Sequence, residues 1–135
     1  MRDQNLTKVT PLPAAASTSS PTGLDTNASP VCGDLGNHAF FHITCPATPA
    51  LADAKTIIFT IEHSDSASSG FSAVPGISPH TITGSGGAGA AAVDEFRPIP
   101  RSTRRFVRCT AAVLTAGGDS TALSYTFSVD LNPIR

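Results

Sequence analysis

The chain has 135 residues, enough for one domain that buries its own core without disulfides or metal. Its formal net charge of −1 excludes binding to nucleic acid through overall positive charge, and no apolar run is long enough to span a bilayer. Charged residues make up only 14% of the chain, against about 25% in ordinary soluble domains, so the surface suits contact with other proteins better than strong solvation.

Residues 1–30 have a composition of their own, rich in Pro, Ser, Thr and Ala. Four prolines between positions 11 and 30 argue against a helix or an interior strand there. We therefore expect an extended N-terminal arm that is disordered alone or laid along a partner, with residues 31–135 forming the domain. The apolar anchors expected to contact the partner are Leu6, Val9, Leu12 and Leu24. The alternative is a tail without a role.

From about residue 36 onward, side chains alternate between apolar and polar in the manner of strands with one buried face. In residues 56–63 the isoleucine Ile58 breaks the polar side of the alternation, so both faces of that strand are expected to be partly covered. The longer predicted strands are residues 38–45, 56–63, 105–114 and 121–131, and the shorter ones are residues 72–74, 80–83 and 93–97.

Turn residues separate these runs, at positions 64–70, 75–76 and 116–119. No stretch of ten or more residues carries a helical apolar stripe. Several short strands without helices between them predict an all-β fold, an antiparallel β-sandwich or jelly roll. The start of the chain lacks the apolar region of a signal peptide, so we expect synthesis in a reducing cytoplasm.

No motif for catalysis or cofactor binding stands out. Residues 84–89 formally match G-x-G-x-x-G, but a dinucleotide site needs a helix after this turn, and Pro98 follows too soon. The three cysteines Cys32, Cys45 and Cys109 are widely spaced, which favours buried reduced thiols over a zinc site or a disulfide framework. We expect no enzyme activity and no cofactor.

Two histidines raise the question of a metal. On a strand, His38 and His42 point to the same face, but the sequence nominates no third ligand. Half-exposed strand histidines are far more common than metal sites, so no metal is predicted.

The strongest charge feature is a set of arginines near the end of the chain. Five of the nine Lys and Arg residues fall within twelve positions, and Phe106 lies among them on the predicted strand face of Arg104 and Arg108. The five are Arg97, Arg101, Arg104, Arg105 and Arg108. Arginine suits bidentate contacts with carboxylates, so one interpretation is an interface with an acidic partner, with Arg97, Arg101, Arg104, Phe106 and Arg108 as contact residues. The other is a solvated face with local salt bridges to Asp94 or Glu95.

Several segments together resemble the small head-decoration proteins of tailed bacteriophages, similar to the jelly-roll cement proteins of Bordetella-type phages. The resemblance covers most of the chain and is a pattern of strands and turns. The segments that carry it are residues 58–65, 70–76, 96–100, 104–108 and 124–129, together with the N-terminal stretch that contains Leu24 and Asp25.

This resemblance implies a structural virion protein, assembled in the host cytoplasm, that binds the outer surface of the capsid. It would sit where neighbouring major capsid proteins meet, as a homo-oligomer (dimer or trimer), and stabilise the head. One alternative is a carbohydrate- or receptor-binding jelly-roll module on a virion surface, although the chain has no Trp and its one tyrosine, Tyr125, falls on the expected buried face. A third possibility is a small β-fold enzyme such as a cupin. The sequence lacks the His/Glu metal cluster that such an enzyme would need.

Overall fold

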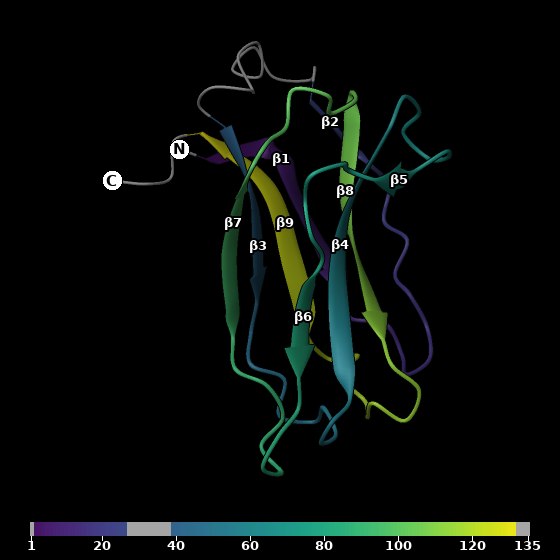
Figure 1. Cartoon of the computed structure of the whole chain (residues 1–135), viewed down its shortest axis with the longest axis vertical. Coiled ribbons are helices and arrows are strands. Elements are labelled where there is room, and N and C mark those ends of the chain that lie inside the picture. The colour runs from purple at the N-terminus through teal and green to yellow at the C-terminus, as the bar shows by residue number, and fades with distance from the viewer. Residues whose placement is uncertain (1, 27–38, 132–135) are drawn as a thin grey trace.

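The computed structural model describes residues 2–26 and 39–131, and in these ranges all regular structure is β (Figure 1). In chain order the strands are β1 (Arg2–Pro11), β2 (Leu24–Asp25), β3 (Ala39–Cys45), β4 (Thr56–Ser64), β5 (Ser72–Ala73), β6 (His80–Thr83), β7 (Val93–Pro98), β8 (Phe106–Val113) and β9 (Ser124–Leu131). No helix long and apolar enough to cross a membrane occurs in the described part of the chain.

The strands form two antiparallel sheets that pack against each other. The first sheet has the order β1-β9-β3-β7, and the second has the order β2-β8-β4-β5, with β6 also paired to β4. In Figure 1, β7, β3 and β9 lie to the left, and β6, β4 and β8 lie to the right. The predicted all-β antiparallel sandwich is confirmed.

The core lies between the sheets and follows the predicted alternation. Phe59 of β4 meets Tyr125 of β9 edge to face across the two sheets, with ring centroids 5.4 Å apart. Phe41 and Phe127, on neighbouring strands of the first sheet, lie 5.6 Å apart. The other inward-facing apolar residues of β3, β4, β8 and β9 are Ala39, Ile43, Cys45, Ile57, Ile61, Val107, Cys109, Ala111, Val113 and Val129. Such aromatic contacts add to the free energy gained from buried apolar area.

Residues 2–26 do not form the separate arm predicted above, because they are part of the sandwich. Strand β1 pairs with β9 at one edge of the first sheet, and β2 pairs with β8 in the second. Leu6, Leu12 and Leu24 are 1%, 2% and 8% exposed and belong to the core. Residues 27–30 of the predicted arm lie outside the described residues.

Between β1 and β2, residues 12–23 cross from one sheet to the other, and we call this segment the N-terminal crossing. The amides of Ala16 and Ser19 donate to the carbonyls of Val113 and Ala111, at 3.0 and 2.9 Å. The prolines fit this path, because Pro11 ends an edge strand and Pro13 lies in the crossing, where no ladder amide is required. This segment thus closes one side of the sandwich.

The glycine-rich loop of residues 84–89 serves packing. At Gly89, φ is +71° and an added Cβ would lie 1.9 Å from the carbonyl oxygen of Thr48. The amide of Gly87 donates to the carboxylate of Asp53 at 2.9 Å. The strand β7 follows this loop, so the helix that a dinucleotide site would need is not found there.

Candidate partner-contact surface

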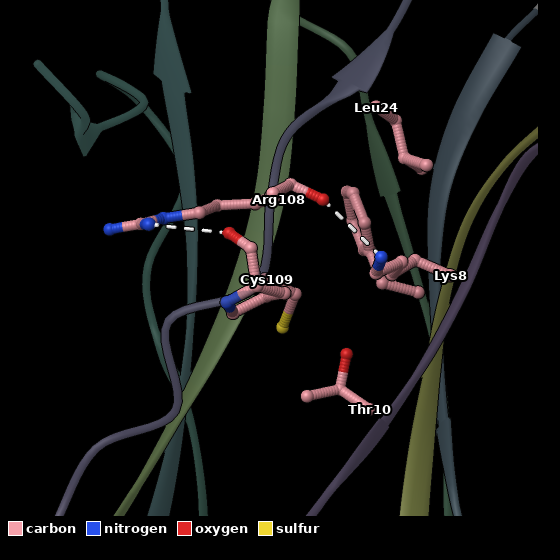
Figure 2. A pocket seen from close by; sticks show the side chains of 8 residues that line it. Lys8, Thr10, Leu24, Arg108 and Cys109 are labelled. Carbon is pink, nitrogen blue, oxygen red and sulfur yellow. Dashed lines mark hydrogen bonds between the residues drawn. The ribbon is translucent and has the colours of Figure 1, made fainter. Parts of the chain in front are cut away.

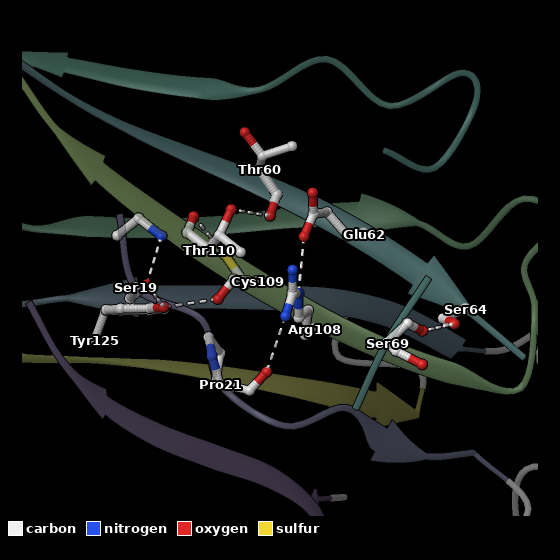
Figure 3. A network of polar contacts seen from close by, with 11 residues as sticks. Ser19, Pro21, Thr60, Glu62, Ser64, Ser69, Arg108, Cys109, Thr110 and Tyr125 are labelled. Atoms are coloured by element: carbon white, nitrogen blue, oxygen red, sulfur yellow. Dashed lines mark hydrogen bonds and ion pairs between the residues drawn. The ribbon is translucent and has the colours of Figure 1, made fainter. Parts of the chain in front are cut away.

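Arg108 is held by the protein itself. Its guanidinium donates to the Glu62 carboxylate at 2.8 Å and to the carbonyl of Pro21 at 3.3 Å (Figure 3), and it lies 4.1 Å from the centre of the Phe71 ring. Both charged side chains are largely buried. Arg108 therefore joins β8, β4 and the N-terminal crossing, and it is not free to contact a partner.

Three further arginines are paired within the chain. Arg105 makes two bonds of 2.8 Å to the carboxylate of Asp25, which raise the pKa of Arg105, and it covers the ring of Phe106 at 5.0 Å. Arg97 contacts Glu95 at 2.8 Å and Arg104 contacts Asp65 at 3.7 Å.

Arg101 differs from these four. It is exposed, and it makes no ion pair with any residue in the described ranges. Of the predicted arginine contacts, Arg101 and Arg104 are both exposed, and Arg104 makes only the 3.7 Å contact with the exposed Asp65.

Gly23 allows the N-terminal crossing to lie close to Phe71 and Phe106, the two rings that Arg108 and Arg105 cover. A Cβ at Gly23 would lie 2.8 Å from the Phe71 ring and 3.0 Å from Cβ of Phe106. The Phe71 ring and the Cβ of Phe106 thus pack directly on the backbone that leads into β2. These side chains and the arginines together hold the segment before β2 against the second sheet.

Of the four apolar residues predicted to anchor an arm, only Val9 is on the surface. It is 60% exposed and pairs with Thr126 on the edge strand β1. Leu24 instead lines a crevice between β1 and the crossing segment, where Nζ of Lys8 donates to the Thr22 hydroxyl at 3.3 Å (Figure 2). The crevice is too narrow to admit a water molecule. It is a packing seam.

A chain of hydrogen bonds through the half-buried Ser19 and the buried Tyr125 fixes the same region. The amide of Ala111 donates to Oγ of Ser19 at 2.9 Å, Ser19 and Tyr125 share a hydrogen bond of 2.6 Å, and the Tyr125 hydroxyl donates to the carbonyl of Cys109 at 2.7 Å (Figure 3). Burial raises the pKa of Tyr125 to about 12. The only tyrosine in the chain is therefore part of the core, as its place in the alternation predicts.

The two described cysteines are also core residues. Burial raises the pKa of the Cys45 thiol to about 11 and that of the Cys109 thiol further, the latter with contributions from Glu62 and Cys45. Both are free thiols, as predicted, and Cys32 lies outside the described residues.

His42 is bound by carboxylates. Its Nδ1 lies 2.8 Å from Asp130 and its Nε2 lies 2.5 Å from Asp94, while Phe96 stacks on the ring at 4.0 Å. His38 lies outside the described residues. In the described ranges no group of three or more His, Cys, Asp or Glu side chains is arranged to hold a metal ion.

The outer face of the second sheet carries a groove that the sequence analysis did not identify. Ile58 of β4 is 36% exposed, and Leu114, directly after β8, is 45% exposed. The groove has a volume of about 220 Å³. The side chains that line it are Ala16, Ser17, Thr18, Thr56, Ile58, Ala112, Val113, Leu114 and Thr115. The one sequence signal for this surface is Ile58, which interrupts the polar side of its strand.

This lining is uncharged throughout, among the residues that the structure describes. Strand register sets Thr18, Ala112, Ile58 and Thr81 in one row across the sheet. The neighbouring row pairs Thr56 with Thr83 on β6. Uncharged, β-branched and small side chains on a sheet face can approach another protein surface without the cost of burying an ion.

The sequence matches no protein-family model, and a search of curated proteins finds no match either.

Proposed function

We propose that this protein is a decoration (cement) protein of a tailed-phage capsid. It binds the outer surface of the head where neighbouring major capsid proteins meet, acts as a homo-oligomer, and holds the shell together. The observation that carries the proposal is the uncharged groove, with Ile58 and Leu114 exposed, on the outer face of the second sheet. A surface of that kind fits protein–protein contact.

The strand order supports the jelly-roll part of the resemblance. Strands β1, β3, β7 and β9 lie in one sheet, while β2, β4, β5, β6 and β8 lie in the other. The chain therefore changes sheets at most of its connections. Double-sheet sandwiches with such crossing connections are common in viral coat proteins.

A rigid sandwich with a small contact surface suits reinforcement of a shell. Each copy needs only a weak contact, because many copies on one lattice resist expansion together. The low charge of the chain limits repulsion between neighbouring copies.

The alternative of a carbohydrate- or receptor-binding module receives less support. Such modules present aromatic platforms, whereas Tyr125 is buried and the Phe71 ring is covered by Arg108. Retention of the protein on immobilised glycans would favour this alternative over the capsid proposal.

Co-sedimentation with heads tests the proposal. The purified full chain should pellet with expanded heads assembled without it, and should stay in the supernatant with unexpanded shells. A matched pair of variants locates the contact: Ile58→Lys should reduce binding at least tenfold, whereas Arg105→Lys, in a residue already paired to Asp25, should not. No pelleting with either form of the head would contradict the proposal.

A further inference from the structure

We propose that His63 is an acid-sensitive latch for residues 100–104, the part of the connection between β7 and β8 that carries the exposed Arg101 and Arg104. The neutral ring holds this segment against the second sheet, and the segment is released when the ring takes up a proton. The latch lies where β4 ends, next to β5, and away from the groove, so the inference does not rest on the proposed function (Figure 1).

The segment lies between two fixed points. Ile99, directly before it, is 6% exposed and belongs to the core. The carbonyl of Arg105, directly after it, accepts hydrogen bonds from the amide and the hydroxyl of Thr26 at 3.0 and 2.6 Å. These two anchors confine a movement to the residues between them, so the rest of the sandwich can stay folded when the segment moves.

The hydrogen bond to His63 ties the middle of this segment to the second sheet. The amide and the hydroxyl of Thr103 donate to the carbonyl of Pro100 at 3.1 and 2.7 Å, and both bonds lie within the segment. The amide of Arg104 instead donates to Nδ1 of His63 at 3.1 Å, and His63 is 4% exposed. The 3.7 Å contact between Arg104 and Asp65 joins two exposed side chains and contributes little.

Protonation of the ring would remove this bond. Because Nδ1 accepts the amide of Arg104, the neutral ring carries its proton on Nε2. The imidazolium has a proton on each nitrogen, so Nδ1 becomes a donor that faces another donor. The amide of Arg104 then has no acceptor on His63, and it regains one by moving the segment into water.

Two charged side chains set the pH at which the latch opens. Burial lowers the pKa of His63, the guanidinium of Arg104 lowers it further, and the carboxylate of Asp65 raises it. The ring is therefore neutral at neutral pH, and the segment is held there. Release follows as the pH falls below the ordinary pKa of imidazole, about 6.5.

The strands on either side of His63 add no charge to this balance. Its register partners are Val107 on β8 and Ser72 on β5, and both are uncharged. Glu62, the preceding residue on β4, points to the opposite face of the strand and is paired with Arg108. The latch thus depends on the ring, on Arg104 and on Asp65.

Backbone nitrogen-15 relaxation of the full chain at about pH 7.5 and about pH 5, on either side of the ordinary histidine pKa, tests the inference. In the wild type, the order parameters of residues 101–104 should be about 0.85 at the higher pH and below about 0.6 at the lower pH. The amide of Leu114, which donates to Thr56 in the same sheet, should stay ordered at both.

His63→Asn separates the proton from the hydrogen bond. Its side-chain carbonyl can accept the amide of Arg104 in place of Nδ1 and does not titrate, so the segment should stay ordered at both pH values. His80→Asn is the matched control, because it removes another histidine of the same sheet, on β6. It should leave the response of the segment to acid as in the wild type.

Two further variants should move the pH of release in opposite directions. Arg104→Ala keeps the backbone amide and removes the guanidinium that lowers the pKa of His63, so release should begin at a higher pH. Asp65→Asn removes the carboxylate that raises this pKa, so release should begin at a lower pH. A segment that stays ordered at about pH 5 in the wild type, or that loses order equally in His63→Asn, would overturn the inference.

Discussion

The N-terminal leucines and the apolar residues of the groove occupy opposite situations in the molecule. Leu6 and Leu12 come from a segment whose composition predicts an exposed arm, and they are buried in the core. Ile58 comes from a regular strand, and it is exposed. Composition therefore describes a segment as a whole, whereas contact with a partner depends on which face of a sheet each side chain occupies.

The exposure of these residues differs because different parts of the structure cover them. The N-terminal segment lies along an edge of both sheets, so its leucines fall between the layers. Ile58 points away from the core on the second sheet, where its row neighbours are Ala112 and Thr81. Neither is a long side chain that can cover it.

Deletion of residues 1–26 should have the largest effect and would test the buried side of the comparison. The deletion removes β1, β2 and three core leucines. Burial of each leucine contributes about 2–5 kcal/mol relative to alanine, and a domain is stable by only ~5–15 kcal/mol in total. The truncated chain should show no cooperative thermal transition by circular dichroism. A truncated protein that melts like the full chain would restore the arm interpretation.

A single substitution should give a smaller effect of the same kind. Leu12→Ala should lower the free energy of unfolding by about 3 kcal/mol, because it leaves a cavity in the core. Val9→Ala, on the exposed face of the same strand region, should change it by less than ~0.5 kcal/mol. Urea denaturation of both variants measures the contrast, and equal effects would contradict the assignment of these two positions.

The arginines offer a second contrast within the chain. Arg108→Ala should destabilise the fold by about 2 kcal/mol, since it leaves Glu62 without its partner and uncovers Phe71. Arg101→Ala should have an effect within ~0.5 kcal/mol, as expected at an exposed site. Chemical denaturation checks both. If Arg108→Ala is neutral, then the Arg108 contacts do not fasten the N-terminal crossing.

Acid should weaken the fold modestly through His63. Burial, with a contribution from Arg104, lowers the pKa of His63 below its ordinary value, and its Nδ1 accepts the amide of Arg104 at 3.1 Å. The unfolded chain therefore takes up this proton first as pH falls, so the free energy of unfolding decreases as pH drops below about 6.5. His63→Gln should flatten the dependence between pH 7 and 5.5. An unchanged slope in that variant would assign it to other groups.

The sequence predicts strands well where apolar side chains on the buried face alternate with polar side chains on the exposed face. The alternation in residues 38–45, 56–63 and 105–114 corresponds to β3, β4 and β8, and residues 80–83 match β6. Strand β1 leaves no such signal, because the positions next to Leu6 on its inner side are Lys8 and Thr10, which line the seam against β2. Pro11 at the end of β1 also favours a loop in the sequence, although an edge strand tolerates a proline there.

The internal pairing of the arginines is not predicted by the sequence, because the partners are far apart along the chain. The carboxylates that neutralise Arg105 and Arg108 come from positions 80 and 46 residues away, so no local pattern reveals them. Val9 and Arg101 are exposed as a contact residue requires. The groove is assembled from the crossing segment, β4 and β8, and Ile58 alone hints at it in the sequence.

Native-state hydrogen exchange tests most directly the claim that residues 2–26 are built into the sandwich. The amides of Leu12, Ser19 and Thr26 donate to carbonyls of Leu123, Ala111 and Arg105 at 2.9 to 3.0 Å. They should exchange at least ~1,000-fold more slowly than in an unfolded peptide, as the Leu114 amide on Thr56 should. Exchange of these three amides at the unfolded rate, with Leu114 still protected, would contradict the account.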